Sequence, residues 1–281
     1  MARLRSSRIT LLLCAAGALL LVGAIFAVPL SGQEPSPTTP AVQAITPAEQ
    51  VLPPPIPDGS ASAEQLEVQG DELRAQKRYL DSIDYYNAAL VKKPTSLLWN
   101  KKGMSYLFIQ RRDQAAKCFD KAIKLDKQAP EGYNNRGYVE QMKKNYDKAI
   151  KYYGKAIKLR PTDAVFYFNT GSSYFGKHEY PEAANFYRQA FAIDPEIFNR
   201  ASRTGVMAQS TSPADRAVFS FMVAKMYAQA GDVDHCLEYL RKAMEDGYKD
   251  INKVYTDREF ATLRTDKRFE ELMAQRPQAI P

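Results

Sequence analysis

This chain of 281 residues has few of the side chains on which most enzymes rely for chemistry. It contains 2 histidines and 3 cysteines. Neither His178 nor His235 stands in a set of Cys, His and Asp residues with the spacing of zinc ligands. Three cysteines do not form a paired disulfide framework, and no G-x-S-x-G elbow is present. The sequence therefore predicts no catalytic residues, no metal site and no cofactor.

A phosphate-binding loop is also absent, although one segment imitates it. The run GSSYFGKH at 171–178 matches G-x-x-x-x-G-K, but His178 stands where a Ser or Thr must ligate magnesium. Such a loop follows a β-strand, and no run in this chain has a convincing period of two. We therefore expect no small-molecule substrate and no enzymatic activity.

The chain contains instead a glycine that recurs at a nearly constant interval. Gly70, Gly103, Gly137 and Gly171 are 33, 34 and 34 residues apart, which is typical of a repeat architecture. Apolar residues at steps of three and four give each unit two helices with one apolar stripe apiece, and the small residues allow those helices to pack closely. Bulky apolar residues stand four positions before each glycine, aromatic residues sixteen after, and alanines nineteen after: Leu66, Trp99, Tyr133, Tyr167; Tyr86, Phe119, Tyr153, Tyr187; Ala89, Ala122, Ala156, Ala190.

Runs such as WNKKGMSYLFIQRRDQAAKCFDKAIKLD and YNNRGYVEQMKKNYDKAIKYYGKAIKLRP resemble the tetratricopeptide repeat, a 34-residue helix–turn–helix. The resemblance covers roughly 63–272 and implies an all-α fold, a right-handed superhelical solenoid of antiparallel helix pairs. Ala224 takes the glycine position in a fifth unit, and the ending resembles that of many bacterial tetratricopeptide proteins. The expected parts are four units at 63–95, 96–129, 130–163 and 164–197, an insert at 198–216, a fifth unit at 217–250, and a C-terminal cap and tail at 251–281.

The first 62 residues have a different composition. Three arginines precede 9–28, twenty uncharged residues that would span about 30 Å as a helix, the thickness of the bilayer's apolar core. We expect 1–30 to be an uncleaved signal-anchor helix in the cell membrane, with the repeats extracytoplasmic and periplasmic in a Gram-negative cell. The alternative is a signal peptide cleaved after Ala27 and a secreted protein. Eight prolines and no aromatic residue make 31–62 a predicted disordered linker.

Basic residues are concentrated in the middle of the chain. Residues 92–160 contain 18 Lys and Arg against 6 Asp and Glu. An anionic partner and a solvated convex face are both consistent with this charge, and the expected compartment disfavours nucleic acid. Seven of the lysines lie on predicted second helices: Lys117, Lys121, Lys124, Lys148, Lys151, Lys155 and Lys158.

The resemblance implies that the first helices line a concave groove that binds partners. Asn135 and Asn169 occupy the position at which family members hold the backbone of an extended peptide, because an amide both donates and accepts hydrogen bonds. The cations of the family's chaperone-tail clamp are missing. The expected groove residues are Asn100, Lys101, Met104, Asn134, Asn135, Tyr138, Met142, Phe168, Asn169, Ser172, Phe175, Phe221 and Met222.

The function expected from these features is a membrane-tethered, non-enzymatic scaffold for protein–protein interaction. Its partner would be an extended or helical protein segment with apolar anchors. One alternative is an accessory subunit of a cell-envelope complex that makes its contacts through the basic convex face or the tail. Another possibility left open is that the insert 198–216 or the chain's own tail fills part of the groove.

Overall fold

The computed structural model describes residues 56–203 and 212–277, and within them the backbone forms helices and turns without any strand. The predicted membrane segment and most of the predicted linker lie outside the described residues. No helix within the described ranges is long and apolar enough to cross a membrane.

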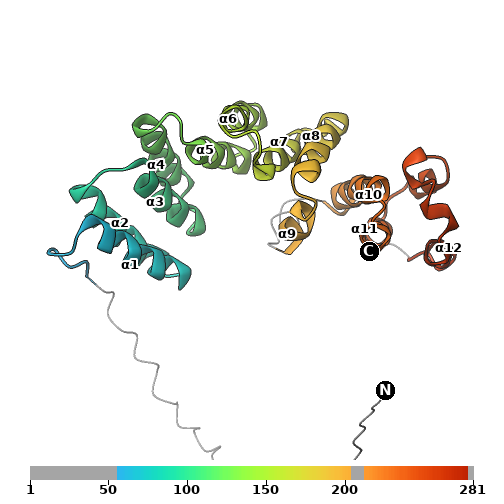
Figure 1. Ribbon diagram of the computed structural model, residues 1–281, viewed down its shortest axis with the longest axis horizontal. Helices are drawn as coiled ribbons and strands as arrows, with labels where there is room; N and C mark the ends of the chain where they lie inside the picture. The colour runs from blue at the N-terminus through green and yellow to red at the C-terminus, as the bar shows by residue number, and fades with distance from the viewer. Residues whose placement is uncertain (1–55, 204–211, 278–281) are drawn as a thin grey trace, which may run out of the picture. The chain divides into compact units, whose positions relative to one another are not determined.

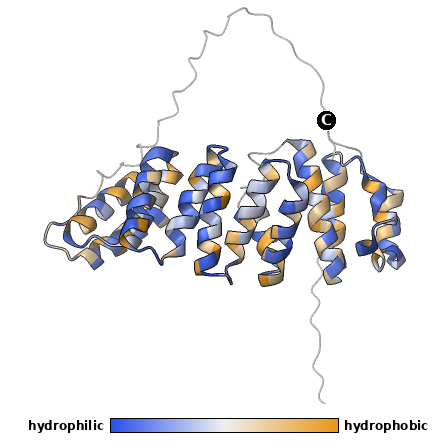
Figure 2. Ribbon diagram, turned by 90° about the horizontal axis from the view of Figure 1, so that it is seen from above, coloured by the Kyte–Doolittle hydropathy of each residue, from blue (hydrophilic) through white to orange (hydrophobic). Residues whose placement is uncertain are grey.

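Eight helices of similar length form four successive hairpins, in which each second helix also packs against the first helix of the next pair (Figure 1). Their small residues and apolar stripes allow this packing, and hydrophobic and hydrophilic residues mix along individual helices (Figure 2). The pairs are α1 (Ala63–Ala75) with α2 (Tyr79–Lys92), α3 (Ser96–Phe108) with α4 (Arg112–Leu125), α5 (Pro130–Met142) with α6 (Tyr146–Leu159), and α7 (Ala164–Gly176) with α8 (Tyr180–Ile193).

The recurring glycines bring the two helices of each hairpin into close contact. A Cβ atom added to Gly137 would stand 2.8 Å from the ring of Tyr153, and one added to Gly103 would stand 2.5 Å from Phe119. Both rings are fully buried. The glycine is therefore required by packing, and Gly171, which opens the imitation phosphate loop, is an ordinary member of helix α7.

The hairpin turns share a left-handed residue seven positions after the glycine. Lys77, Gln110, Lys144 and His178 have φ between 60° and 62° there. In the fifth hairpin the same position is Gly231, with φ 76°. His178 therefore closes a turn.

The C-terminal part begins with the short helix α9 (Ile197–Arg203) and continues after residue 211. Phe198 of α9 is 1% exposed and contacts the rings of Phe168, Tyr187 and Phe191 at centroid distances of 6.0, 5.8 and 5.9 Å. Helix α9 thus packs into the core. The following elements are α10 (Pro213–Ala230), α11 (Val233–Glu245), the 3-10 helices η1 (Ile251–Tyr255), η2 (Arg258–Phe260) and η3 (Leu263–Thr265), and α12 (Lys267–Ala274).

Candidate functional site

The candidate binding surface lies on the first helices α3, α5 and α7, which contact one another in sequence order. Four asparagines of these helices are joined by hydrogen bonds. Asn135 Nδ2 donates to Asn100 Oδ1 at 2.9 Å, and Asn169 Nδ2 donates to Asn134 Oδ1 at 2.9 Å. Asn134 Nδ2 donates to Asn135 Oδ1 at 3.2 Å. We call this continuous set of four side chains the amide chain.

The amide chain keeps unused hydrogen-bonding capacity. A side-chain amide carries two N–H donors and an oxygen with two lone pairs. Asn135 uses one N–H toward Asn100 and one lone pair toward Asn134. All four asparagine residues are half-buried and so belong to the partly exposed surface. The surface can therefore both donate to and accept from the backbone of a bound peptide.

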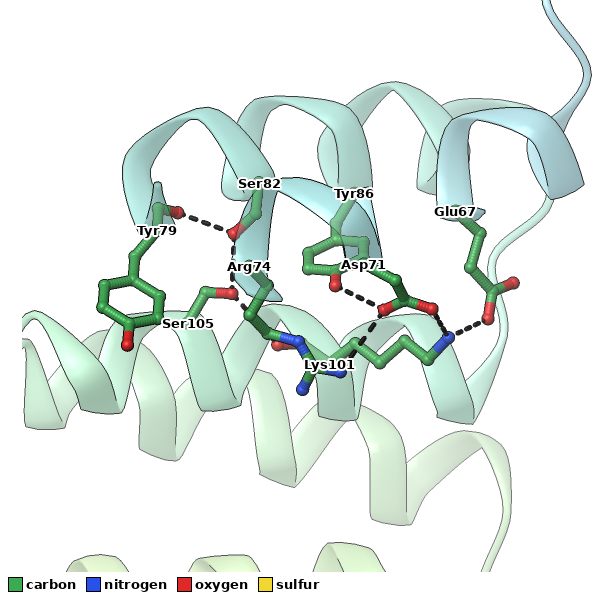
Figure 3. Close-up of polar contacts among 8 residues, drawn as sticks. All are labelled: Glu67, Asp71, Arg74, Tyr79, Ser82, Tyr86, Lys101 and Ser105. Atoms are coloured by element: carbon green, nitrogen blue, oxygen red, sulfur yellow. Dashed lines mark hydrogen bonds and ion pairs between the residues drawn. The ribbon is translucent and has the colours of Figure 1, made fainter. Parts of the chain in front are cut away.

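The first unit continues the same arrangement with charged groups (Figure 3). Lys101 Nζ lies 2.5 Å from Glu67 Oε1 and 2.5 Å from Asp71 Oδ2, and the Tyr86 hydroxyl donates to Asp71 at 2.7 Å. Burial opposes the charged form of Lys101, but the hydrogen bonds to Asp71 and Glu67 outweigh this effect and raise the pKa of its ammonium group. The predicted groove cation Lys101 is thus neutralised within the protein.

The predicted groove residues belong to units two to five, so Glu67 and Asp71 of the first unit are not among them. The glycine register was the signal that could have found them. Gly70 places Glu67 and Asp71 at the positions that Asn100 and Met104 occupy 33 residues later.

Apolar members of the predicted groove meet between α3 and α5. Met104, Tyr138 and Met142 are half-buried and pack against one cluster that contains Leu107 and Phe119. Burial raises the pKa of the Tyr138 hydroxyl above its ordinary value. Methionine and tyrosine at a partly exposed site suit adaptable apolar contacts.

Three predicted groove residues are in the core instead. Phe168, Phe175 and Phe221 are 6%, 3% and 4% exposed. Phe168 is covered by Phe198 of α9, and Phe221 stacks on Tyr248 at 4.3 Å. The expectation that these rings are open to a partner is therefore corrected: large apolar rings beside the insert and the C-terminal segment are buried by the chain itself.

The remaining two predicted residues make internal contacts. Ser172 Oγ donates to the Phe168 carbonyl at 3.0 Å and accepts from the Tyr187 hydroxyl at 3.2 Å. Met222 is half-buried against the C-terminal core. Among the described residues, no group of His, Cys, Asp and Glu could hold a metal ion.

Comparison with known families identifies the repeat. Residues 97–128, 130–163 and 169–196 each match a model described as tetratricopeptide repeat. The segment 97–196, which holds α3 to α8, therefore carries tetratricopeptide repeats. All four asparagines of the amide chain lie within these three matched stretches.

Individual similarities are more distant. The chain is 31% identical over 70 residues to a chloroplastic protein of Arabidopsis thaliana, a match that covers 25% of this chain and about a fifth (21%) of that protein. A crystal structure of MamA is 22% identical, with 65% of this chain and 96% of that chain covered and a TM-score of 0.45. MamA from residue 41 of Desulfovibrio magneticus RS-1 is 17% identical, with 68% of this chain and 96% of that chain covered and a TM-score of 0.48.

Proposed function

We propose that this protein is a scaffold for protein–protein interaction that binds an extended segment of a partner along α3, α5 and α7. The tetratricopeptide repeats at 97–196 support the general role. The amide chain is the observation that carries the specific one, because it offers donors and acceptors at regular intervals on consecutive helices. Tethering to a membrane is the second part of the proposal and rests on the uncharged run 9–28 alone.

The bound segment would present its backbone to the asparagines and apolar side chains to the neighbouring cluster. Backbone C=O and N–H groups can pair with the spare N–H and lone pair of each amide. Met104, Tyr138 and Met142 would contact its apolar anchors, together with Phe108, which is 54% exposed and stacks on Tyr79. A neutral, apolar segment fits best, because Lys101 is already neutralised by its own carboxylates.

The site is bounded on both sides. Glu67 and Asp71 form its charged end on α1. On the other side, Phe168 occupies the position equivalent to Asn134 in the glycine register and is covered by α9. The polar surface therefore ends where the apolar core of the C-terminal part begins, and a partner segment would lie between these limits.

Site-specific photo-crosslinking in the source cells tests this proposal. A photoreactive phenylalanine replaces Phe108 or Met142 on the proposed surface, and the exposed Gln114 of α4 as the control. We expect adducts from the first two positions and a loss of these adducts in Asn135→Ala/Asn169→Ala. A hydrogen bond contributes about 1 kcal/mol, so losing two should weaken binding by about tenfold or more.

The matched control is Asn185→Ala, an exposed asparagine on α8 that lies outside the amide chain. It should leave the adducts unchanged. Adducts from Gln114 that persist in the double variant would overturn the proposal and favour the alternative, contact through the second helices.

A further inference from the structure

Two neighbouring second helices carry the same pattern of exposed lysines. On α4 the exposed residues Lys117, Lys121 and Lys124 follow one another at steps of four and three, which places them on one side of the helix. On α6 each has a counterpart 34 residues later, so the repeat puts both rows at the same place in their units. Figure 1 shows α4 and α6 on the same side of the row formed by α3 and α5. We call the six residues Lys117, Lys121, Lys124, Lys151, Lys155 and Lys158 the basic face.

The three acids within α4 and α6 pair with other residues. Asp113 pairs with Lys143 at 2.6 Å, and the equivalent Asp147 pairs with Lys177 at 2.8 Å. Asp120 pairs with Arg136. Within the described part of the chain no ion pair joins a lysine of the basic face to a carboxylate. The six ammonium groups are therefore not held in direct ion pairs by these residues.

The pattern belongs to units two and three alone. In each row the first and last lysines are seven positions apart, or about 10 Å along the helix, and the two rows together make a patch extended in two directions. The equivalent positions of the flanking second helices carry no base: Asp84, Ala88 and Val91 on α2, and Asn185, Gln189 and Ala192 on α8.

We infer that the basic face binds the surface of an anionic phospholipid membrane. Protein interfaces are depleted in lysine and depend on aromatic, methionine and arginine anchors. On α4 and α6, both fully described, the one large apolar side chain that is exposed is Leu125 at the end of α4. Flexible lysines do not need fixed bidentate geometry, and clusters of four to eight bases on a helical surface suit anionic lipid headgroups. The observations thus favour lipid over an acidic protein.

This interaction goes beyond the proposed function and is independent of it. The basic face lies on second helices, whereas the amide chain lies on first helices. A membrane on one surface and a peptide on the other could be bound together.

Vesicle binding of the unit Pro53–Pro281 tests the inference. This unit contains every described helix and all four apolar clusters, so it has a complete core of its own; circular dichroism checks its folding. It also lacks the run 9–28, the proposed membrane segment. The vesicles are phosphatidylcholine with and without phosphatidylglycerol, at low and high salt. We expect binding to the anionic vesicles only, and its loss at high salt.

Two variants with the same change in charge identify the surface. In the first, Lys121, Lys124, Lys151 and Lys158 become Gln; in the control, the exposed Lys77, Lys144, Lys249 and Lys267 become Gln. Each base near an anionic surface contributes about fivefold, so we expect the first variant to bind at least about tenfold more weakly and the control to change little. Equal losses in the two variants, or no binding of the parent unit, would overturn the inference. Binding of a polyglutamate peptide without vesicle binding would assign the face to an acidic protein and overturn it as well.

Discussion

Replacing Gly137 by alanine should destabilise the protein, although alanine is the better helix former. The added Cβ would lie 2.8 and 2.9 Å from two ring carbons of Tyr153 and 3.2 Å from the Ala149 carbonyl oxygen. Carbon atoms normally approach to about 3.5–4.0 Å, so the ring must move by about 1 Å. Tyr153 is fully buried, and its hydroxyl donates to Gln141 at 2.8 Å, which leaves the ring little freedom to move.

The same unit supplies a matched control. Gly154 lies inside α6, and a Cβ there would meet nothing within 4 Å. Both variants gain up to about 1 kcal/mol of helix propensity, so the difference between them isolates the cost of overpacking, about 1–3 kcal/mol. We expect Gly154→Ala to raise the free energy of unfolding of the unit Pro53–Pro281. The free energy of unfolding of Gly137→Ala should be lower than that of Gly154→Ala by about 1–3 kcal/mol.

Urea unfolding followed by circular dichroism measures the two values. A second measurement replaces the ring of Tyr153 by a smaller side chain. In a Tyr153→Leu background, Gly137→Ala should lower the free energy of unfolding much less, because the two contacting residues are coupled. Equal stability of the two alanine variants would refute the reasoning. So would an unchanged cost of Gly137→Ala in the Tyr153→Leu background, because the ring could then not be the obstacle.

Three further predictions concern the turns, the insert helix and the thiols. Lys144 has φ 60°, so Lys144→Gly should raise the free energy of unfolding by about 0.5 kcal/mol, whereas Gly231→Ala at φ 76° should lower it by about 1–2 kcal/mol. Changes in the same direction for the two variants would contradict this. Phe198→Ala should cost about 3–5 kcal/mol and speed hydrogen exchange in α7, and an unchanged midpoint would contradict the burial of α9. Burial raises the pKa of Cys118 to about 11 and that of Cys236 to about 12. Their thiols should therefore react with Ellman's reagent only on unfolding, and stability should fall as the pH rises above about 9, since the unfolded thiols release protons that the folded ones keep; rapid native labelling would refute this.

Much of the helical array follows from sequence because its contacts are short-range. Each glycine meets an aromatic ring sixteen positions later, and each hairpin packs mainly on its neighbours. The same register places Asn135 and Asn169 on equivalent faces of α5 and α7. The register does not predict which hydrogen-bond or ion-pair partner each side chain has. The asparagines bond to one another, and Lys101 bonds to two carboxylates of the preceding helix pair.

The sequence by itself determined the period, the helix pairs and the set of residues that share a face, since each depends on local spacing that repeats along the chain. The tertiary structure alone decided which of those residues remain open. Phe168 stands at the position of Asn134, yet it is buried because the non-repeating helix α9 places Phe198 over it. Phe221 is buried by the C-terminal segment in the same way. A periodic pattern does not predict such contacts, because they join repeating elements to segments that occur once.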